Sequence, residues 1–176
     1  ESIKKLDHVQ DTAKVGLLLS LSNELVNTQP RESFTYAREA LSLSETLKNH
    51  NLIGAANLAL SRVYSATAVY DKALNYAFDA LKEFEKTGNN NQKASCYEQI
   101  GLIHMLSGDF TQARENYGKA LDINKNTLNY PFISSNYMNM GLNYVQADSV
   151  DKGLSYFLVS LMIADSLNLQ SEKVAL

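Results

Sequence analysis

The chain has 176 residues, 45% of them hydrophobic and 20% charged, which suits one folded domain with a continuous apolar core. Its net charge of −3 excludes the global positive field that draws nucleic acid or anionic lipid to a protein. The single cysteine, Cys96, excludes an internal disulfide and a thiolate zinc site within the chain, and no apolar run approaches the roughly 18 residues of a membrane span.

The first predicted helix pair covers residues 11–49. Its first helix contains the apolar run Val15–Leu21 and ends before "NTQP", Asn27–Pro30, where the proline suits the first turn of another helix. That second helix contains "SFTYAREAL", and Asn49 marks the turn to the next pair.

The second predicted pair covers residues 50–89 and contains "NLALSRVY" and "KALNYAFDAL". A loop at Lys86–Asn91 is predicted to separate it from the third pair. We interpret Glu83 and Glu85, close to Lys82 and Lys86, as charges on a solvated helix face.

The third predicted pair covers residues 90–129. One face of its first helix carries an apolar residue at every third position, namely Tyr97, Ile100, Ile103 and Leu106. The following "SGDF" breaks this helix, because Gly108 can adopt the left-handed conformation that ends a helix and Asp109 can cap the next one.

The fourth predicted pair covers residues 130–169, with "YMNMGLNY" and "KGLSYFLVSL". Residues 170–176 resemble the start of a fifth repeat, and the chain begins with Glu1 rather than methionine. We therefore expect a processed form or a piece of a longer protein. Its C-terminal end either was cut at this point or packs on another chain or domain.

The pairs repeat with a period near 40 residues: leucine recurs at positions 41, 81, 121 and 161, each time preceded by a small residue. Two helices approach to ~8 Å only where their contact points lack bulk. We therefore expect Gly101 and Ala113, which belong to further series of small residues, to lie where the helices of one pair cross. His104 stands where the neighbouring repeats have Tyr64 and Tyr144, which indicates a packing position rather than a catalytic one.

These motifs resemble those of the tetratricopeptide-repeat (TPR) family, most clearly "YEQIGLIH" with "QARENYGKAL" in the third pair. The resemblance implies an all-α fold, a right-handed α-solenoid of antiparallel helix pairs forming a single TPR domain over residues 1–176. The basic TPR unit has about 34 residues, so the longer repeat is similar to the branch found in kinesin light chains and bacterial peptide-sensing regulators.

No group of residues predicts chemistry. The three histidines, His8, His50 and His104, form no HExxH or His/Cys cluster, so no metal site is expected. Cys96 is interpreted as a structural thiol, and Gly108–Asp109 as a helix connection rather than a phosphate loop. The sequence therefore predicts a protein that is not an enzyme and that needs no cofactor.

The resemblance further implies that the first helix of each pair lines a concave groove. The predicted partner-binding residues are Leu19, Asn23, Leu58, Arg62, Ser65, Glu98, Gln99, Leu102, Met105, Met138, Asn139 and Leu142. Gln99 and Asn139 are predicted to form an amide ladder that holds a peptide backbone, beside adaptable methionine and leucine. Arg62 is nearly the only base in this set, so a strongly acidic ligand is not expected. The alternative is that these residues simply face water.

The leading hypothesis is a non-catalytic module that binds a protein or peptide of mixed or apolar character. By resemblance it would be the scaffold or sensor part of a larger bacterial signalling or regulatory protein, in which such an array precedes a membrane helix and a kinase or DNA-binding domain. The alternative is self-association, as a homodimer formed through the open C-terminal end. We expect a soluble chain, cytoplasmic or extracytoplasmic, with neither nucleic-acid binding nor direct membrane insertion.

Overall fold

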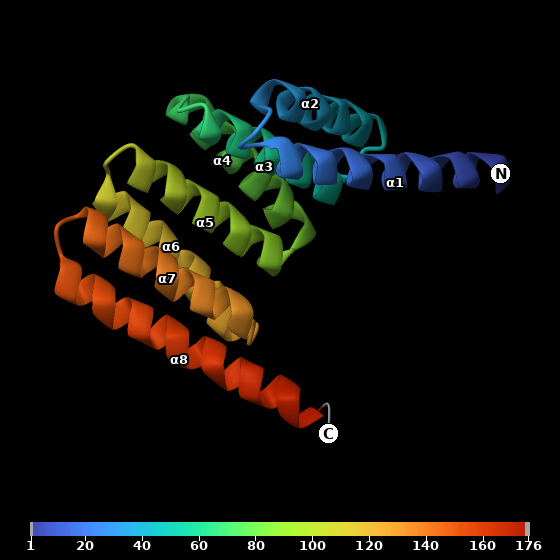
Figure 1. Ribbon diagram of the computed structural model, residues 1–176. Helices are drawn as coiled ribbons and strands as arrows, with labels where there is room; N and C mark the ends of the chain where they lie inside the picture. Colours follow the sequence, from blue (N-terminus) through green and yellow to red (C-terminus); the bar gives the residue numbers. More distant parts are fainter. Residues whose placement is uncertain (1, 175–176) are drawn as a thin grey trace. The chain divides into compact units, whose positions relative to one another are not determined.

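The computed structural model describes the backbone of residues 2–174 and the side chains of residues 11–167. The described backbone forms eight α-helices and no strand (Figure 1). The helices are α1 Ser2–Leu25, α2 Pro30–Thr46, α3 His50–Ala66, α4 Tyr70–Thr87, α5 Asn90–Leu106, α6 Phe110–Asn126, α7 Tyr130–Gln146 and α8 Val150–Val174.

Successive helices pack against each other. α1 packs on α2, α3 on α4 and α7 on α8, and between the pairs α2 packs on α3 and α6 on α7. α1 also contacts α3, so the first helices of the first two pairs touch directly. The expected all-α solenoid architecture is confirmed by this succession of contacts. The chain divides into two compact units, Glu1–Gln99 and Ile100–Leu176, with the division inside α5.

Residues with a left-handed backbone conformation lie in six of the turns between the described helices. Gly88 and Gly108 have φ of 68° and 87°, and non-glycine residues adopt φ between 52° and 58° at Lys48, Ala68, Leu128 and Asp148. Asp109 then caps α6, because its Oδ1 accepts the backbone N–H of Gln112 at 3.0 Å. The predicted roles of Gly108 and Asp109 are confirmed, and Pro30 is the first residue of α2 as expected.

Ala68→Gly is expected to raise the free energy of unfolding by about 0.5–1 kcal/mol. A left-handed conformation costs an L-residue roughly 1–2 kcal/mol, and the greater freedom of glycine in the unfolded chain cancels part of that gain. The exposed methyl group of Ala68 contributes no packing that would be lost. The matched control, Ala66→Gly at the exposed last residue of α3, should instead destabilise by about 0.5–1 kcal/mol. Urea unfolding followed by circular dichroism measures both, and effects of the same sign would contradict this account.

Small residues lie where the helices of a pair cross, as predicted. A Cβ atom on Gly101 would lie 3.2 Å from the Ala113 carbonyl oxygen and 2.8 Å from the Tyr117 ring. In the α3–α4 pair, the Ser61 hydroxyl donates to the Ala73 carbonyl at 2.8 Å. This close approach is possible because neither crossing position carries a large side chain.

His104 shares its backbone role with the tyrosines of the neighbouring repeats. The carbonyls of Tyr64, His104 and Tyr144 each accept the N–H of the residue five positions later, at 2.8, 2.8 and 2.9 Å. All three side chains are half-buried near the ends of their helices. These observations agree with the packing interpretation of His104.

The connection between the second and third pairs is shorter than the predicted loop. α4 continues to Thr87 and α5 begins at Asn90, which leaves only Gly88 and Asn89 between them. Gly88 supplies the left-handed conformation, and the Asn89 N–H bonds to the Phe84 carbonyl at 3.1 Å, so two residues suffice to reverse the chain.

Glu83 is not the simple solvent-facing charge that the sequence predicted. Its carboxylate accepts a hydrogen bond from Lys86 Nζ at 2.6 Å and bonds His50 Nδ1 at 2.6 Å, and the side chain is only 15% exposed. Burial, the largest single influence, raises the pKa of the Glu83 carboxyl, but the bonds from Lys86 and His50 together lower it below its usual value. Glu83 therefore ties α4 to the start of α3.

α8 continues without a break from Val150 to Val174. The predicted boundary between residues 130–169 and a fifth repeat at 170–176 therefore coincides with no helix end in the described backbone. Residues 175–176, and the side chains after residue 167, lie outside the described part. The assignment of a fifth repeat stays a prediction.

Candidate functional site

The predicted groove residues all lie on the first helices of the pairs. α1, α3 and the first part of α5 hold seven of them within the unit Glu1–Gln99, and the rest of α5 and α7 hold five within Ile100–Leu176. The two groups differ in chemistry. The first contains most of the polar groups, and the second is mainly leucine and methionine.

Arg62 is the centre of the polar group in the first unit. Its Nη1 donates to Asn23 Oδ1 at 2.9 Å, which links α3 to α1. Burial lowers the pKa of the Arg62 guanidinium, and the negative charge of Glu98 on α5 opposes that shift. Arg62 on α3 is thus bonded to α1, and the charge of Glu98 on α5 acts on it.

The repeat period explains why Asn23 and Arg62 meet. They lie 39 residues apart, one fewer than the usual period, because the first repeat is one residue shorter between its helices. The two residues therefore occupy equivalent positions on adjacent first helices, which are in contact. Side chains at equivalent positions on neighbouring parallel helices face the same side.

The arginine can donate further hydrogen bonds. A guanidinium carries five N–H donors in one plane, and among the described residues Asn23 is the acceptor bonded to it. A half-buried guanidinium with remaining donors can bind the carbonyl oxygens of a peptide segment. Glu98 adds a negative charge to the same region, which disfavours a ligand rich in carboxylates.

Gln99 adds a second polar feature of this region. The residue is buried, and its Nε2 has no hydrogen-bond partner among the described residues. An unpaired buried amide costs roughly 1–3 kcal/mol. A rotation that brings this amide to a ligand carbonyl would relieve that cost.

Burial separates the predicted groove residues into two groups. Those that the structure buries are Leu58, Ser65, Gln99 and Met105. Met105 packs with Ala113 and Tyr117, and half-buried Leu102 contacts the same cluster. These side chains help to hold the helices together and present little surface to a partner in this conformation. Their role in binding stays a prediction.

The second unit presents apolar side chains at the predicted positions of α7. Met138 and Leu142, one turn apart, are 52% and 40% exposed. Asn139 beside them is half-buried. Because α7 carries no charged residue, this helix surface suits an apolar contact.

Comparison with known proteins supports the repeat assignment. Residues 94–127, within α5 and α6, match the tetratricopeptide repeat family model. The crystal structure of BtubC (BKLC) from P. vanneervenii superposes with a TM-score of 0.73 over 88% of this chain, at 18% sequence identity. The chain therefore contains a tetratricopeptide repeat within a fold of helical repeats. It covers 64% of the BtubC chain, and no curated protein sequence matches it.

A TPR-type fold typically serves as a scaffold for protein–protein interaction and not as an enzyme. Burial raises the pKa of Cys96 to about 12 against the effect of Arg62, so the thiol stays protonated at neutral pH. Within the described residues, no three histidine, cysteine, aspartate or glutamate side chains are placed to hold a metal ion. None of the helices in residues 2–174 is both long and apolar enough to cross a membrane.

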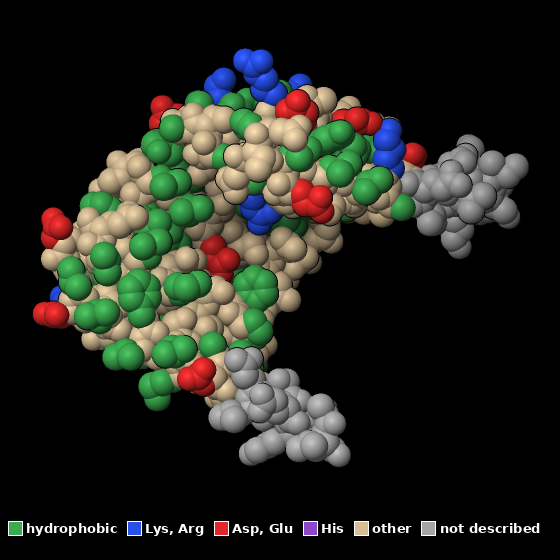
Figure 2. Space-filling view, in the orientation of Figure 1, with side chains coloured by type: hydrophobic (Ala, Val, Ile, Leu, Met, Phe, Trp, Pro, Cys, Tyr) green, Lys and Arg blue, Asp and Glu red, His purple; other side chains and the backbone are tan. Residues whose placement is uncertain are grey.

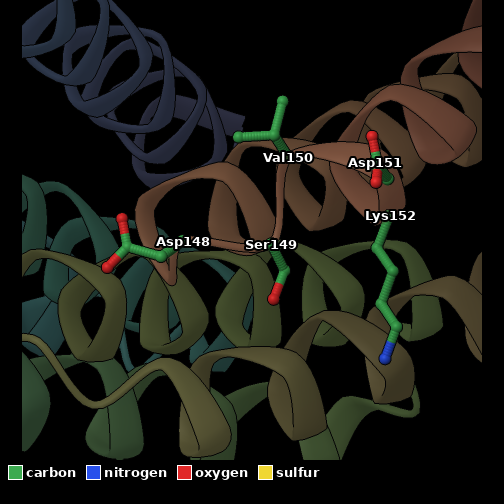
Figure 3. A pocket seen from close by; sticks show the side chains of 5 residues that line it. All are labelled: Asp148, Ser149, Val150, Asp151 and Lys152. Atoms are coloured by element: carbon green, nitrogen blue, oxygen red, sulfur yellow. The ribbon is translucent and has the colours of Figure 1, made fainter.

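The described part of the chain has several open hollows on its surface. One lies at the α7–α8 turn and is lined only by the consecutive residues 148–152 (Figure 3). Figure 3 shows Val150 and Asp151 pointing to one side of the first turn of α8, and Ser149 and Lys152 pointing to the other. This hollow follows the outside of the turn, where the first side chains of α8 point in different directions.

The sequence-based reasoning missed an apolar surface on α8. Exposed large apolar residues gather there, as Figure 2 shows over the part of the molecule where α7 and α8 lie. A signal was present in the sequence: Met162 stands one, two and three periods after Asp122, Lys82 and Ser42, which are all polar. At this position the polar side chain of the earlier second helices is replaced by an apolar one in α8.

Proposed function

We propose that this TPR protein binds a segment of a partner protein along the first helices of residues 2–99. The proposal rests on the hydrogen bond between Arg62 and Asn23, together with the negative charge of Glu98, which acts on the same guanidinium. The hydrogen bond joins two successive first helices, and a charge on a third acts on the same group, as is expected of the binding face of a repeat array. A partner would meet the remaining hydrogen-bond donors of a guanidinium that Asn23 of the neighbouring helix holds in place.

The chemistry of this region favours a peptide of mixed or apolar character. Arg62 offers donors to peptide carbonyls, and Glu98 opposes a strongly acidic ligand. In the second unit, Met138 and Leu142 offer apolar contact to a partner. The resemblance of the repeats to TPR segments of bacterial signalling proteins supports a scaffold or sensor role in a larger protein of that kind, on either side of the cytoplasmic membrane.

Self-association is the second candidate function. The exposed leucines of α8 favour it, because a second copy could cover them in a homodimer. Sedimentation velocity over a range of concentrations tests this candidate directly.

The test of the binding proposal compares two arginine variants. Arg62→Gln removes the charge at the proposed face, and the control Arg38→Gln makes the same change on exposed α2. We expect a protein from the native cell lysate that the parent chain and Arg38→Gln retain and Arg62→Gln loses. Peptides tiled over that protein should include one that binds Arg62→Gln at least tenfold more weakly, about 1.4 kcal/mol. Equal retention by both variants, with equal thermal unfolding, would place the binding face elsewhere.

A further inference from the structure

A hollow of about 510 Å³ lies between the start of α2 and the end of α3, within the first unit. Its wall contains the rings of Phe34 and Tyr64 and the apolar side chains of Pro30 and Val63, and Arg31 is its charged residue. Binding sites for small molecules typically have volumes of roughly 300–1,000 Å³ and an apolar, aromatic lining with a few polar groups. This hollow has both properties.

The aromatic wall of the hollow is held in place by its neighbours. The rings of Phe34 and Tyr64 meet edge to face, with their centres 5.8 Å apart. Tyr64 also stacks on Tyr76 of α4, and Phe34 packs against the cluster that contains Ala59 and Leu60. A ligand would therefore not have to order these rings, which lowers the entropic cost of binding.

The second unit shows what fills the equivalent place there. Two periods after Arg31, Phe34, Val63 and Tyr64, the equivalent residues are Thr111, Arg114, Asn143 and Tyr144. The Arg114 guanidinium lies 5.2 Å from the centre of the Tyr144 ring and donates to Asn143 Oδ1 and Thr111 Oγ1, each at 3.2 Å. A small planar group thus lies beside the tyrosine. In the first unit Phe34 packs inward instead, and the hollow remains open.

Two substitutions reverse the charge that this place prefers. Asn143 and Thr111 provide the oxygen atoms that accept hydrogen bonds from a cation in the second unit. The first unit has Val63 and Arg31 at these positions, which replace one acceptor by an apolar side chain and the other by a positive charge. A planar cation is therefore disfavoured in the hollow, and a planar group with a negative charge is favoured.

The surrounding charges support the same choice. Arg31 is exposed, and no hydrogen bond or ion pair joins its guanidinium to another described residue. Lys72 Nζ lies 5.4 Å from the centre of the Tyr64 ring and adds a second positive charge nearby. Glu32 and Asp71, the acidic residues next to these two bases in the sequence, do not line the hollow.

We infer that this hollow binds a small aromatic carboxylate. The ring of the ligand packs against Phe34 and Tyr64, and its carboxylate meets the planar fork of donors on Arg31. The hollow lies between α3 and α2, whereas Arg62 joins α3 to α1 in the proposed partner-binding face. The inference is therefore independent of the proposed function.

The experiment titrates the isotope-labelled 176-residue chain with matched probes and follows its backbone amide NMR signals. Indole-3-propionate and tryptamine share the ring and the two-carbon chain and differ in charge, and propionate alone lacks the ring. We expect saturable shifts at residues 30–35 and 63–67, with a Kd for indole-3-propionate at least tenfold lower than for either control. Equal binding of the two indoles, or an absence of saturable shifts in these segments, would overturn the inference.

Charge variants locate the carboxylate. Arg31→Glu should reverse the order, so that tryptamine binds more tightly than indole-3-propionate, and because Arg31 is exposed the variant should still fold. The control Arg38→Glu makes the same change seven residues later on α2, outside the hollow, and should bind as the parent does. Arg62→Gln should also bind as the parent does. Loss of binding in that variant would place the ligand at the other face and overturn the inference.

A third variant closes the hollow. Arg31→Thr, Phe34→Arg and Val63→Asn together copy the arrangement around Arg114 and Asn143 into the first unit, and this variant should lose indole-3-propionate binding while keeping its helical circular dichroism. If it does not fold, Arg31→Glu still decides the question.

A short peptide with phenylalanine next to aspartate distinguishes the free acid from a partner protein. We expect it to bind no more tightly than indole-3-propionate. Binding at least tenfold tighter would assign the hollow to a partner's side chain and overturn the inference.

Discussion

Phe84→Ala is expected to lower the free energy of unfolding by about 3–5 kcal/mol, the largest effect predicted for this chain. The ring is 1% exposed and lies on α4 directly over Gly54 of α3. A Cβ atom on Gly54 would lie only 2.8 Å from the ring. Removing the phenyl group therefore leaves a cavity at the contact between two helices. Urea unfolding followed by circular dichroism at 222 nm measures the loss.

The close contact makes Gly54→Ala a test of the same packing. By itself, this substitution should destabilise the protein by about 1–3 kcal/mol, because the new methyl group meets the Phe84 ring. In the Phe84→Ala background the methyl group enters the cavity, and helix propensity should make it stabilising by about 0.5–1 kcal/mol. Additive effects of the two substitutions would contradict the contact, since residues that touch are expected to couple.

Gly153→Ala is the second large effect. It should lower the free energy of unfolding by about 1–3 kcal/mol, despite the higher helix propensity of alanine. The added Cβ atom would lie 2.5 Å from Val145 Cγ2 and 2.8 Å from the carbonyl oxygen of Gly141. The side chain can rotate away, but the backbone oxygen can move only if α7 and α8 separate. Thermal and urea unfolding both report this change.

Gly118→Ala is the matched control in the same unit. Gly118 lies in the middle of α6, and a Cβ atom added there would have no neighbouring atom within 4 Å. The same substitution should therefore stabilise by about 0.5–1 kcal/mol. If both variants were stabilised equally, the close approach of α7 to α8 would be wrong.

Much of the architecture could be predicted because it depends on short stretches of sequence that recur. The capping of α6 by Asp109 and the left-handed Gly108 involve neighbours in sequence, and both were confirmed. The crossing at Gly101 and Ala113 followed from the repetition of small residues at a fixed period. Local backbone preferences and helix periodicity act within a few residues, so a sequence reveals them directly.

Other features depended on residues that are distant in sequence. Glu83 has a lysine three residues away, but its second hydrogen-bond partner, His50, lies at the start of another helix. A left-handed backbone conformation also occurs at Lys48, Ala68, Leu128 and Asp148. The sequence did not predict it at these positions, because the packed helices on either side impose the turn geometry on whichever residue is present.

By itself, the sequence determined the helix pairs, their period, the crossing points and the set of first-helix residues from which a binding face could be built. Only the tertiary structure decided which of those residues are accessible. It buried Leu58 and Gln99, joined Asn23 to Arg62, and left Leu154 and Leu161 of α8 exposed although their equivalents in α2, Phe34 and Leu41, are half-buried. The reason is that a repeat assigns every unit the same side-chain directions, whereas exposure depends on whether a neighbouring helix packs over them.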